Sequence, residues 1–442
     1  MGFGFYIVMA AQFFSALADN ALLICAIALM RDLQVPAEYD SLLKTSFTIS
    51  YVALAAFVGA FADSMPKWRV MFISNGIKIV GCTMMLFSVH PLLAYGIVGL
   101  GAAAYSPAKY GILTEMLPPA KLVNANGWIE GLTVGAIILG TLLGGQLIEG
   151  SFHDWALSLN LPFITSSAQV SILVVGVLYL LAAVLNRYVP DTGVTCKPLR
   201  NDPIYLIREF AHCTSLLWRD RLGQISLAVT TLFWGAGAAL QFIVITWATS
   251  GLNLNLSQAA RLQGVVAIGV AIGAVFAARL LSLRRSTTVI PIGIAMGLIV
   301  PLMVLLPLIP HITLQGPSFE LFGYSFNWEF HVRMLAVMFM MIAVGALSGY
   351  FVVPMNALLQ HRGNSLMGAG HSISVQNFNE NISILVMTGT LPLLLGAGIS
   401  INVVIVLFGS FVAGIMYLIK RWHEANQRLS DDLAKLPDNC SH

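Results

Sequence analysis

The sequence predicts an all-α membrane protein with twelve transmembrane helices arranged in two pseudo-symmetric halves of six. Of the 442 residues, 57% are apolar and only 10% are charged. A soluble domain carries about 25% charged residues, so this composition cannot cover a water-soluble surface. With 23 Lys and Arg against 20 Asp and Glu, the net charge is only +3, which excludes a nucleic-acid-binding domain.

Long apolar segments follow one another along the whole chain. A membrane-spanning helix needs about 20 mostly apolar residues. Strands of a membrane β-barrel would instead alternate over about ten residues, whereas residues 287–308 are apolar on every side. The predicted spans are 5–30, 44–62, 70–89, 91–116, 121–148, 167–187, 225–248, 261–282, 287–308, 333–357, 366–395 and 400–419.

The longest connection divides the spans into two sets of six. We expect an N-terminal bundle (1–187), a cytoplasmic linker (188–224), a C-terminal bundle (225–419) and a cytoplasmic tail (420–442). Equivalent spans share weak motifs, as expected for a duplicated transporter. Pro107 precedes Lys109 in the fourth span as Pro354 precedes Asn356 in the tenth, and Asn126 precedes Glu130 in the fifth as Asn377 precedes Glu380 in the eleventh.

The linker carries its own helix signal. Asp202 is a suitable N-cap and Pro203 a suitable first helical residue, ahead of the sequence IYLIREFAHCTSLLW. This pattern predicts an amphipathic helix lying at the cytoplasmic interface, with a structural rather than a regulatory role.

Basic residues occur in every second connection, which sets the orientation because Lys and Arg near span ends stay in the cytoplasm. The connections between them differ: residues 149–166 and 309–332 contain no Lys or Arg. We therefore expect both termini in the cytoplasm and an uncleaved first span. The basic residues are Lys67, Arg69, Lys121, Arg187, Lys197, Arg200, Arg208, Arg219, Arg221, Arg284, Arg285, Arg362, Lys420, Arg421, Arg428 and Lys435.

The cysteine pattern predicts neither a disulfide framework nor a metal site. There are five cysteines, an odd number, and no C-x-x-C pair. We expect no cofactor and no metal.

Charged residues inside predicted spans mark candidate functional positions, because each costs about 2.5 to 3.5 kcal/mol on insertion scales unless it faces a cavity or a partner. Asp19, followed by Asn20, lies past the middle of the first span, and Glu380 and Glu130 lie inside the eleventh and fifth. The alternative is an interhelical hydrogen bond that fixes packing, especially for Asn126. We expect a central cavity lined by spans 1, 4, 5, 7, 10 and 11.

Two lysines receive different predictions. Lys78 lies in the third span, which should be peripheral, so its side chain should extend to the membrane surface. Lys109 lies in the fourth span just after Pro107, where an ammonium beside freed backbone groups could bind a phosphate. A surface-directed Lys109 is an equally good interpretation.

The loop after the second span has the sequence GAFADSMPKWR (59–69). It resembles the signature loop of the major facilitator superfamily, G-x-x-x-D-x-x-G-R-R, with Pro66 and Lys67 replacing the later Gly and Arg. We expect Asp63, with Lys67 and Arg69, to act in gating by charge pairing at the cytoplasmic helix ends.

Longer blocks are similar to bacterial lysophospholipid transporters of that superfamily. The resemblance implies an inner-membrane flippase that carries lysophosphatidylethanolamine and related lipids from the outer to the inner leaflet, where a cytoplasmic-side acyltransferase restores the diacyl lipid. By motif, Asp19 and Lys109 match polar positions of the family, and Gln241 falls where an arginine is expected. The blocks are residues 11–23, 61–81, 99–131, 232–242 and 351–381.

A single-chain amphiphile needs an amphipathic site. Asp19 and Glu380 are candidates for an ammonium and Lys109 for a phosphate. Aromatic side chains could form an acyl-chain wall beside Gly235 and Gly237, which would let the seventh helix bend, although core packing is the more ordinary role of aromatics. The wall residues are Phe13, Phe14, Phe233, Trp234 and Phe242, and the full set of expected substrate-binding residues is Asp19, Asn20, Lys109, Asn126, Glu130, Trp234, Gln241, Asn377 and Glu380.

Two other functions compete with lipid transport. A proton-coupled exporter of a small drug or metabolite would use Asp19 or Glu130 as the titrating group. A membrane-embedded acyltransferase or hydrolase is disfavoured, because neither an H-x-x-x-x-D pair nor a G-x-S-x-G elbow occurs. We therefore expect a monomeric transporter and no enzyme.

Overall fold

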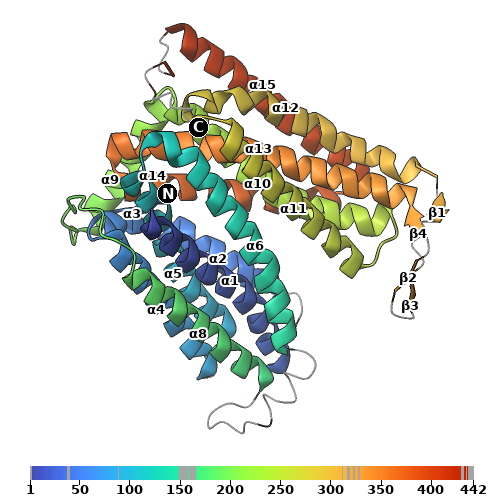
Figure 1. The fold of residues 1–442 in the computed structure, drawn as a ribbon, viewed down its shortest axis with the longest axis horizontal. Coiled ribbons are helices and arrows are strands. Elements are labelled where there is room, and N and C mark those ends of the chain that lie inside the picture. The colour runs from blue at the N-terminus through green and yellow to red at the C-terminus, as the bar shows by residue number, and fades with distance from the viewer. Residues whose placement is uncertain are drawn as a thin grey trace.

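The computed structural model describes residues 2–36, 40–87, 89–148, 158, 166–310, 312–315, 319–321, 324–326, 329–429, 433–434 and 436. Helices run through nearly all of this part of the chain (Figure 1). The first half contains α1 (Phe3–Asp32), α2 (Asp40–Ala53), α3 (Ala55–Asp63), α4 (Lys67–Leu86), α5 (Pro91–Met116), the short 3₁₀ helix η2 (Pro119–Lys121), α6 (Leu122–Ile148) and α8 (Ser167–Arg187).

The second half follows the linker helix α9 (Pro203–Arg219). It contains α10 (Gly223–Gly251), α11 (Leu256–Leu280), η3 (Leu283–Val289), α12 (Ile290–Ile299), η4 (Val300–Leu308), α13 (Val332–Met367), α14 (Ala369–Gly396) and α15 (Ile401–Leu429).

The helical membrane fold is confirmed. Within the described residues, ten helices are long and apolar enough to cross a membrane, and the bent pair α2 and α3 makes an eleventh span. The twelfth is α5, whose 26 residues extend over about 39 Å. Each predicted span coincides with one of these units.

Three elements differ from the predicted shapes. The second span is broken at Leu54, where α2 and α3 meet at 63°. The ninth is divided into η3, α12 and η4 because its prolines lack the N–H that an α-helical turn needs. The tenth continues to Met367, where Gly368 ends it at φ +100°.

The connection before α13 contains strands that the sequence analysis did not predict. Antiparallel pairs form between β1 (Thr313–Gln315) and β4 (Glu329–His331) and between β2 (Phe319–Leu321) and β3 (Tyr324–Phe326).

The linker helix α9 is confirmed. The Asp202 side chain accepts hydrogen bonds from the N–H groups of Ile204 and Tyr205, as an N-cap does. Leu206 and Leu217 are buried against the protein, whereas Ile204 is 64% exposed. The helix therefore keeps an apolar outer face, as an interfacial helix should.

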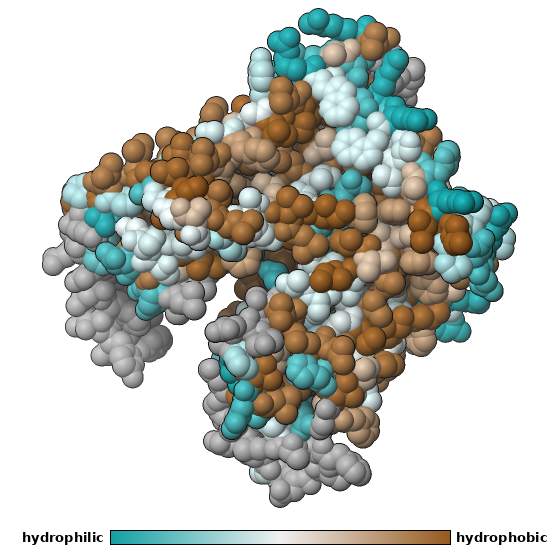
Figure 2. Space-filling view, turned by 180° about the vertical axis from the view of Figure 1, so that it is seen from behind, coloured by the Kyte–Doolittle hydropathy of each residue, from teal (hydrophilic) through white to brown (hydrophobic). Residues whose placement is uncertain are grey.

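The two halves meet at one end and separate at the other. In Figure 1, α3, α9 and the start of α14 lie together on the left, whereas the far ends of α1, α6 and α8 diverge from β1–β4. The halves contact each other through α6 with α11 and through α14 with α3 and α5. Figure 2 shows the surface hollowed between the two arms. The molecule is therefore closed at the end that carries the linker and open at the opposite end.

Candidate functional site

The closed end is fastened by Asp63, the last residue of α3. Its Oδ1 accepts a hydrogen bond from the backbone N–H of Gly370 at 2.7 Å, and its Oδ2 lies 3.2 Å from the N–H of His371 and 2.7 Å from His371 Nδ1. These N–H groups belong to the first turn of α14, where a helix has free donors and a positive dipole end. A carboxylate of the first half thus caps a helix of the second.

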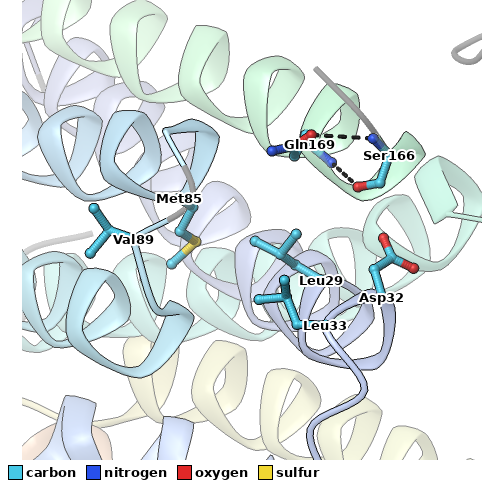
Figure 3. A pocket seen from close by; sticks show the side chains of 7 residues that line it. All are labelled: Leu29, Asp32, Leu33, Met85, Val89, Ser166 and Gln169. Carbon is cyan, nitrogen blue, oxygen red and sulfur yellow. Dashed lines mark hydrogen bonds between the residues drawn. The ribbon is translucent and has the colours of Figure 1, made fainter. Parts of the chain in front are cut away.

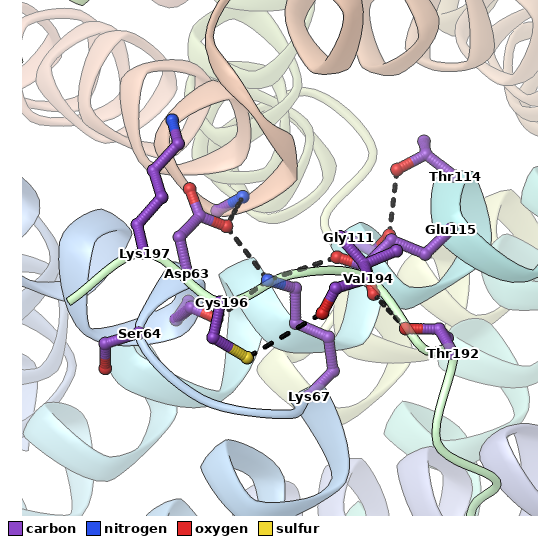
Figure 4. A network of polar contacts seen from close by, with 12 residues as sticks. Asp63, Ser64, Lys67, Gly111, Thr114, Glu115, Thr192, Val194, Cys196 and Lys197 are labelled. Atoms are coloured by element: carbon purple, nitrogen blue, oxygen red, sulfur yellow. Dashed lines mark hydrogen bonds and ion pairs between the residues drawn. The ribbon is translucent and has the colours of Figure 1, made fainter.

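Lys67 holds that carboxylate in place. Its Nζ lies 2.9 Å from Asp63 Oδ1 and 3.2 Å from Glu115 Oε1, and it donates to the carbonyl of Ala62 at 2.7 Å. Glu115 in turn accepts a hydrogen bond from Thr192 at 2.7 Å (Figure 4). The network ties α3, α4, α5 and the linker into one unit.

The linker adds to the same closure. The backbone N–H of Lys197 donates to the Asp63 carbonyl at 2.9 Å, and Lys197 Nζ donates to the Met367 carbonyl at the end of α13 at 3.0 Å. Arg69, expected to act with Asp63 and Lys67, is exposed and lies over the Trp68 ring at 5.1 Å. The structure therefore brings together two of the three expected gating residues.

A second ion pair, which the sequence analysis missed, joins the linker to α13. Arg362 Nε donates to Asp220 Oδ1 at 3.0 Å, and a second Arg362 nitrogen contacts Asp220 Oδ2. Asp220 also accepts from the N–H of Gly223 at the start of α10 at 2.7 Å. A lone aspartate in a polar linker carried no sequence signal for this role.

Further into the membrane, the two halves are joined by an amide pair. The side chains of Asn126 on α6 and Gln360 on α13 exchange two hydrogen bonds of 2.9 Å each, and both are almost fully buried. Such a reciprocal pair satisfies both amides without any ion. Asn126 therefore makes the interhelical bond that was weighed against a binding role.

Next to this pair lies a buried cluster with two carboxylates. Asn356 donates to Glu130 at 3.4 Å, and Gln376 Nε2 contacts Asn356 at 3.1 Å and Glu380 at 2.8 Å. Glu130 is 4% and Glu380 7% exposed. Asn377 donates to Ser106 of the first half at 2.9 Å. The motif residues of the fifth, tenth and eleventh spans thus meet at the interface between the halves.

Asp19 lies in a separate cluster inside the first half. Lys78 Nζ is 2.8 Å from each Asp19 carboxylate oxygen, and the Tyr179 hydroxyl donates to Asp19 at 2.7 Å. The side chain of Lys78 is 1% exposed, so the expectation that it extends to the membrane surface is wrong. The reason is that α4 packs between α5 and α8, where the ammonium finds an anion. Asn20 donates to the Ala16 carbonyl on its own helix.

Lys109 is partly buried and lies over the ring of Tyr110 at 4.2 Å. In the part of the chain that the structure describes, it forms no salt bridge. Its ammonium is thus held by a cation–π contact with its own neighbour in the chain.

The expected aromatic wall is only partly assembled. Phe13 and Phe14 form an edge-to-face pair at 5.6 Å, and Phe233 packs against Trp234 at 5.7 Å. Gly235 does not serve as a bend: a Cβ there would lie 2.1 Å from Ser383 Oγ, so this glycine allows α10 to approach α14 closely.

A small cavity of about 330 Å³ lies in the first half where α1 and α4 end and α8 begins, away from the linker (Figure 3). The sequence analysis did not identify it. It is lined by Leu29, Asp32, Leu33, Met85, Val89, Ser166 and Gln169.

The sequence model of the Major Facilitator Superfamily matches residues 8–388. The chain belongs to this superfamily. The lysophospholipid transporter LplT of Yersinia enterocolitica serotype O:8 / biotype 1B is 37% identical over 399 residues, covering 90% of this chain and 89% of that protein. LplT of Yersinia pestis (strain Pestoides F) is 36% identical over 392 residues, covering 88% and 86%. These relatives confirm the resemblance to lysophospholipid transporters.

Solved structures agree with the fold. The major facilitator superfamily transporter FucP in its outward conformation matches with a TM-score of 0.69 at 13% identity, covering 95% of this chain and 98% of that one. The human organic anion transporter MFSD10 matches with a TM-score of 0.68 at 13% identity, covering 96% and 100%. At such identities the likeness supports the major facilitator fold alone.

Proposed function

We propose that the chain is a lysophospholipid transporter that works by alternating access. It moves lysophosphatidylethanolamine and related lysophospholipids from the outer to the inner leaflet of the bacterial inner membrane. The full-length similarity to LplT proteins supports the substrate class. The observation that supports the mechanism is the concentration of bonds between the halves at one end: Asp63 to α14 and Asn126 to Gln360.

In this proposal the closed end faces the cytoplasm, and both termini lie there. A lipid from the outer leaflet enters the open end, and the bonds at the closed end break in turn to release it inward. An acyltransferase on the cytoplasmic side then uses the lipid. The transporter acts as a monomer and needs no cofactor or metal. Its N-terminal bundle (1–187) and C-terminal bundle (225–419) move relative to each other, joined by the linker (188–224) and followed by the tail (420–442).

The head group binds among polar side chains at the interface between the halves and in the Asp19 cluster of the first half. Lys109, which forms no salt bridge within the described residues, is a binding site for the phosphate. Asp19 and Glu380 remain the candidates for the ammonium, although Lys78 already neutralises Asp19, so a substrate ammonium must share or displace that contact. Asn20, Glu130, Trp234, Gln241 and Asn377 are further proposed substrate contacts.

A proton-coupled exporter is the second candidate. The observation that favours it is the pair of buried carboxylates, Glu130 and Glu380, joined through Asn356 and Gln376. When the halves move apart, Glu130 and Glu380 would lose the partners that link them and would be exposed to water. Such a change would let either carboxyl group gain or lose a proton during the cycle.

Reconstituting the pure protein in liposomes separates the two candidates. Labelled lysophosphatidylethanolamine should cross the bilayer with protein and not without it, at a rate that an imposed proton gradient leaves unchanged. A rate that collapses with the gradient would support the exporter, and no lipid movement at all would contradict lysophospholipid transport.

A further inference from the structure

Lys44 reaches across the open end of the molecule. It lies in the second turn of α2, in the first half, and its side chain is exposed. Its Nζ lies 6.0 Å from the ring centroid of Phe242 on α10, in the second half, and Phe242 is itself 43% exposed. Two exposed side chains of opposite halves thus face each other where the halves separate.

Among the described residues, the ammonium of Lys44 has no anion beside it. Lys67 and Lys78, by contrast, each have a carboxylate, at 2.9 and 2.8 Å. Lys44 forms no salt bridge with any residue that the structure describes, and its ring contact is at the outer limit of a cation–π interaction, about 6 Å. An exposed ammonium without an anion, on the side of the first half that faces the second, is free to form a charge-assisted contact with a phosphate.

The turn of α10 that Lys44 faces carries no charge of its own. Gln241, next to Phe242, is neutral. Its backbone carbonyl accepts from Gln263 Nε2 at 3.0 Å, which fixes this turn of α10 against α11. Lys44 places a positive charge beside the same turn, from the opposite half.

We propose that Lys44 binds the phosphate of the lysophospholipid in the open end, beside Phe242 of the opposite half. This inference rests on the proposed function and adds a specificity residue to it. Phe242 lies nine residues from the outer end of α10, or about 14 Å. The phosphate therefore meets Lys44 in the outer part of the cleft, before the head group reaches Lys109. An ammonium–phosphate contact is charge-assisted and is lost when the charge is removed.

Equilibrium binding to the purified full-length chain tests this. Two ligands with the same acyl chain are compared: lysophosphatidylethanolamine and a monoacylglycerol, which has no phosphate. Lys44→Gln should lower the affinity for lysophosphatidylethanolamine about tenfold and leave the affinity for the monoacylglycerol unchanged. Lys121→Gln removes an equal charge from an exposed residue far from the open end and should change neither. Lys44→Arg should keep the phospholipid affinity.

Moving the charge gives a sharper test. Lys44→Gln combined with Gln241→Arg should restore phospholipid binding toward that of the parent protein. Equal weakening of both ligands, unchanged phospholipid binding in Lys44→Gln, or no restoration by the double variant would overturn the role of Lys44. A parent protein that does not prefer the phospholipid to the monoacylglycerol would instead contradict the proposed function.

Discussion

Asp63 and His371 are 308 residues apart in the sequence, yet they are in direct contact. The Asp63 carboxylate accepts a hydrogen bond from the backbone N–H of His371 at 3.2 Å and lies 2.7 Å from its ring Nδ1. One residue belongs to α3 and the other to α14. Because they lie in different halves, this contact must break when the halves separate at the end that carries the linker. It is a lock on one conformation rather than a part of either bundle.

Asp63→Asn should slow transport with little change in substrate affinity. The substitution removes the charge that the first-turn N–H groups of α14 and Lys67 stabilise, and hydrogen bonds to a charged group contribute about 1.5 to 3 kcal/mol. The proposed head-group residues, Lys109, Asp19 and Glu380, make no contact with Asp63 among the described hydrogen bonds and ion pairs. Turnover in liposomes and equilibrium binding of lysophosphatidylethanolamine should be measured on the same preparation.

His371→Asn is the matched control, because its backbone donor remains and only the ring contact is lost. It should have a smaller effect on turnover than Asp63→Asn. A large loss of binding with turnover per bound substrate intact would show that Asp63 acts in binding instead.

Asn126 and Gln360 should be energetically coupled in the equilibrium between the closed and the open state of the end that carries the linker. Their two 2.9 Å bonds join the halves in a buried site, so replacing either with Ala leaves the other amide unsatisfied, at about 1 to 3 kcal/mol. The double variant should cost less than the sum of the single ones. The rate at which a cysteine at the closed end is labelled should be measured for the parent protein, the two single variants and the double variant. The four rates give the coupling free energy between Asn126 and Gln360. Additive effects would mean that the pair does not hold the halves together.

Spans and caps were predictable because their signals are local. The capped start of α9 at Asp202 and the bounds of α8 follow from a few neighbouring residues. Pairings between helices were not predictable: nothing near Lys78 in the sequence indicates that Asp19, on another helix, neutralises it. The bend at Leu54 also lacks a local breaker. The motif drew attention to Asn126 and Glu130, but their partners Gln360 and Asn356 lie in the other half and depend on how the halves meet.

Cysteine labelling should report the proposed orientation. Cys196 lies exposed in the linker, whereas Cys213 on α9 is 6% exposed, and burial raises the pKa of its thiol to about 11. The thiolate is the reactive form, so at pH 7.5 Cys213 should react slowly and should speed up as the pH rises toward 11. In a Cys440→Ser background, a membrane-impermeant maleimide should label inside-out vesicles and not right-side-out ones. Cys196→Ser should abolish this labelling. Labelling of right-side-out vesicles would reverse the orientation.

Asp19→Asn should destabilise the protein through Lys78. The substitution leaves a buried ammonium without its anion, and breaking a buried ion pair from one side costs about 3 to 5 kcal/mol. Asp19→Asn/Lys78→Met removes both charges and should recover most of the thermal stability in detergent. A double variant no more stable than Asp19→Asn would show that the pair is not the cause.

The same double variant separates the structural role of Asp19 from head-group binding. If Asp19 also attracts the substrate ammonium, the stable double variant should bind lysophosphatidylethanolamine about ten- to a hundredfold more weakly, since a charge-assisted contact of about 1.5 to 3 kcal/mol is lost. Lysophosphatidylglycerol has no ammonium and should be affected far less. Equal changes for both lipids would mean that Asp19 serves only to hold Lys78 and Tyr179 between α1, α4 and α8, and the ammonium site would then have to be sought at Glu380.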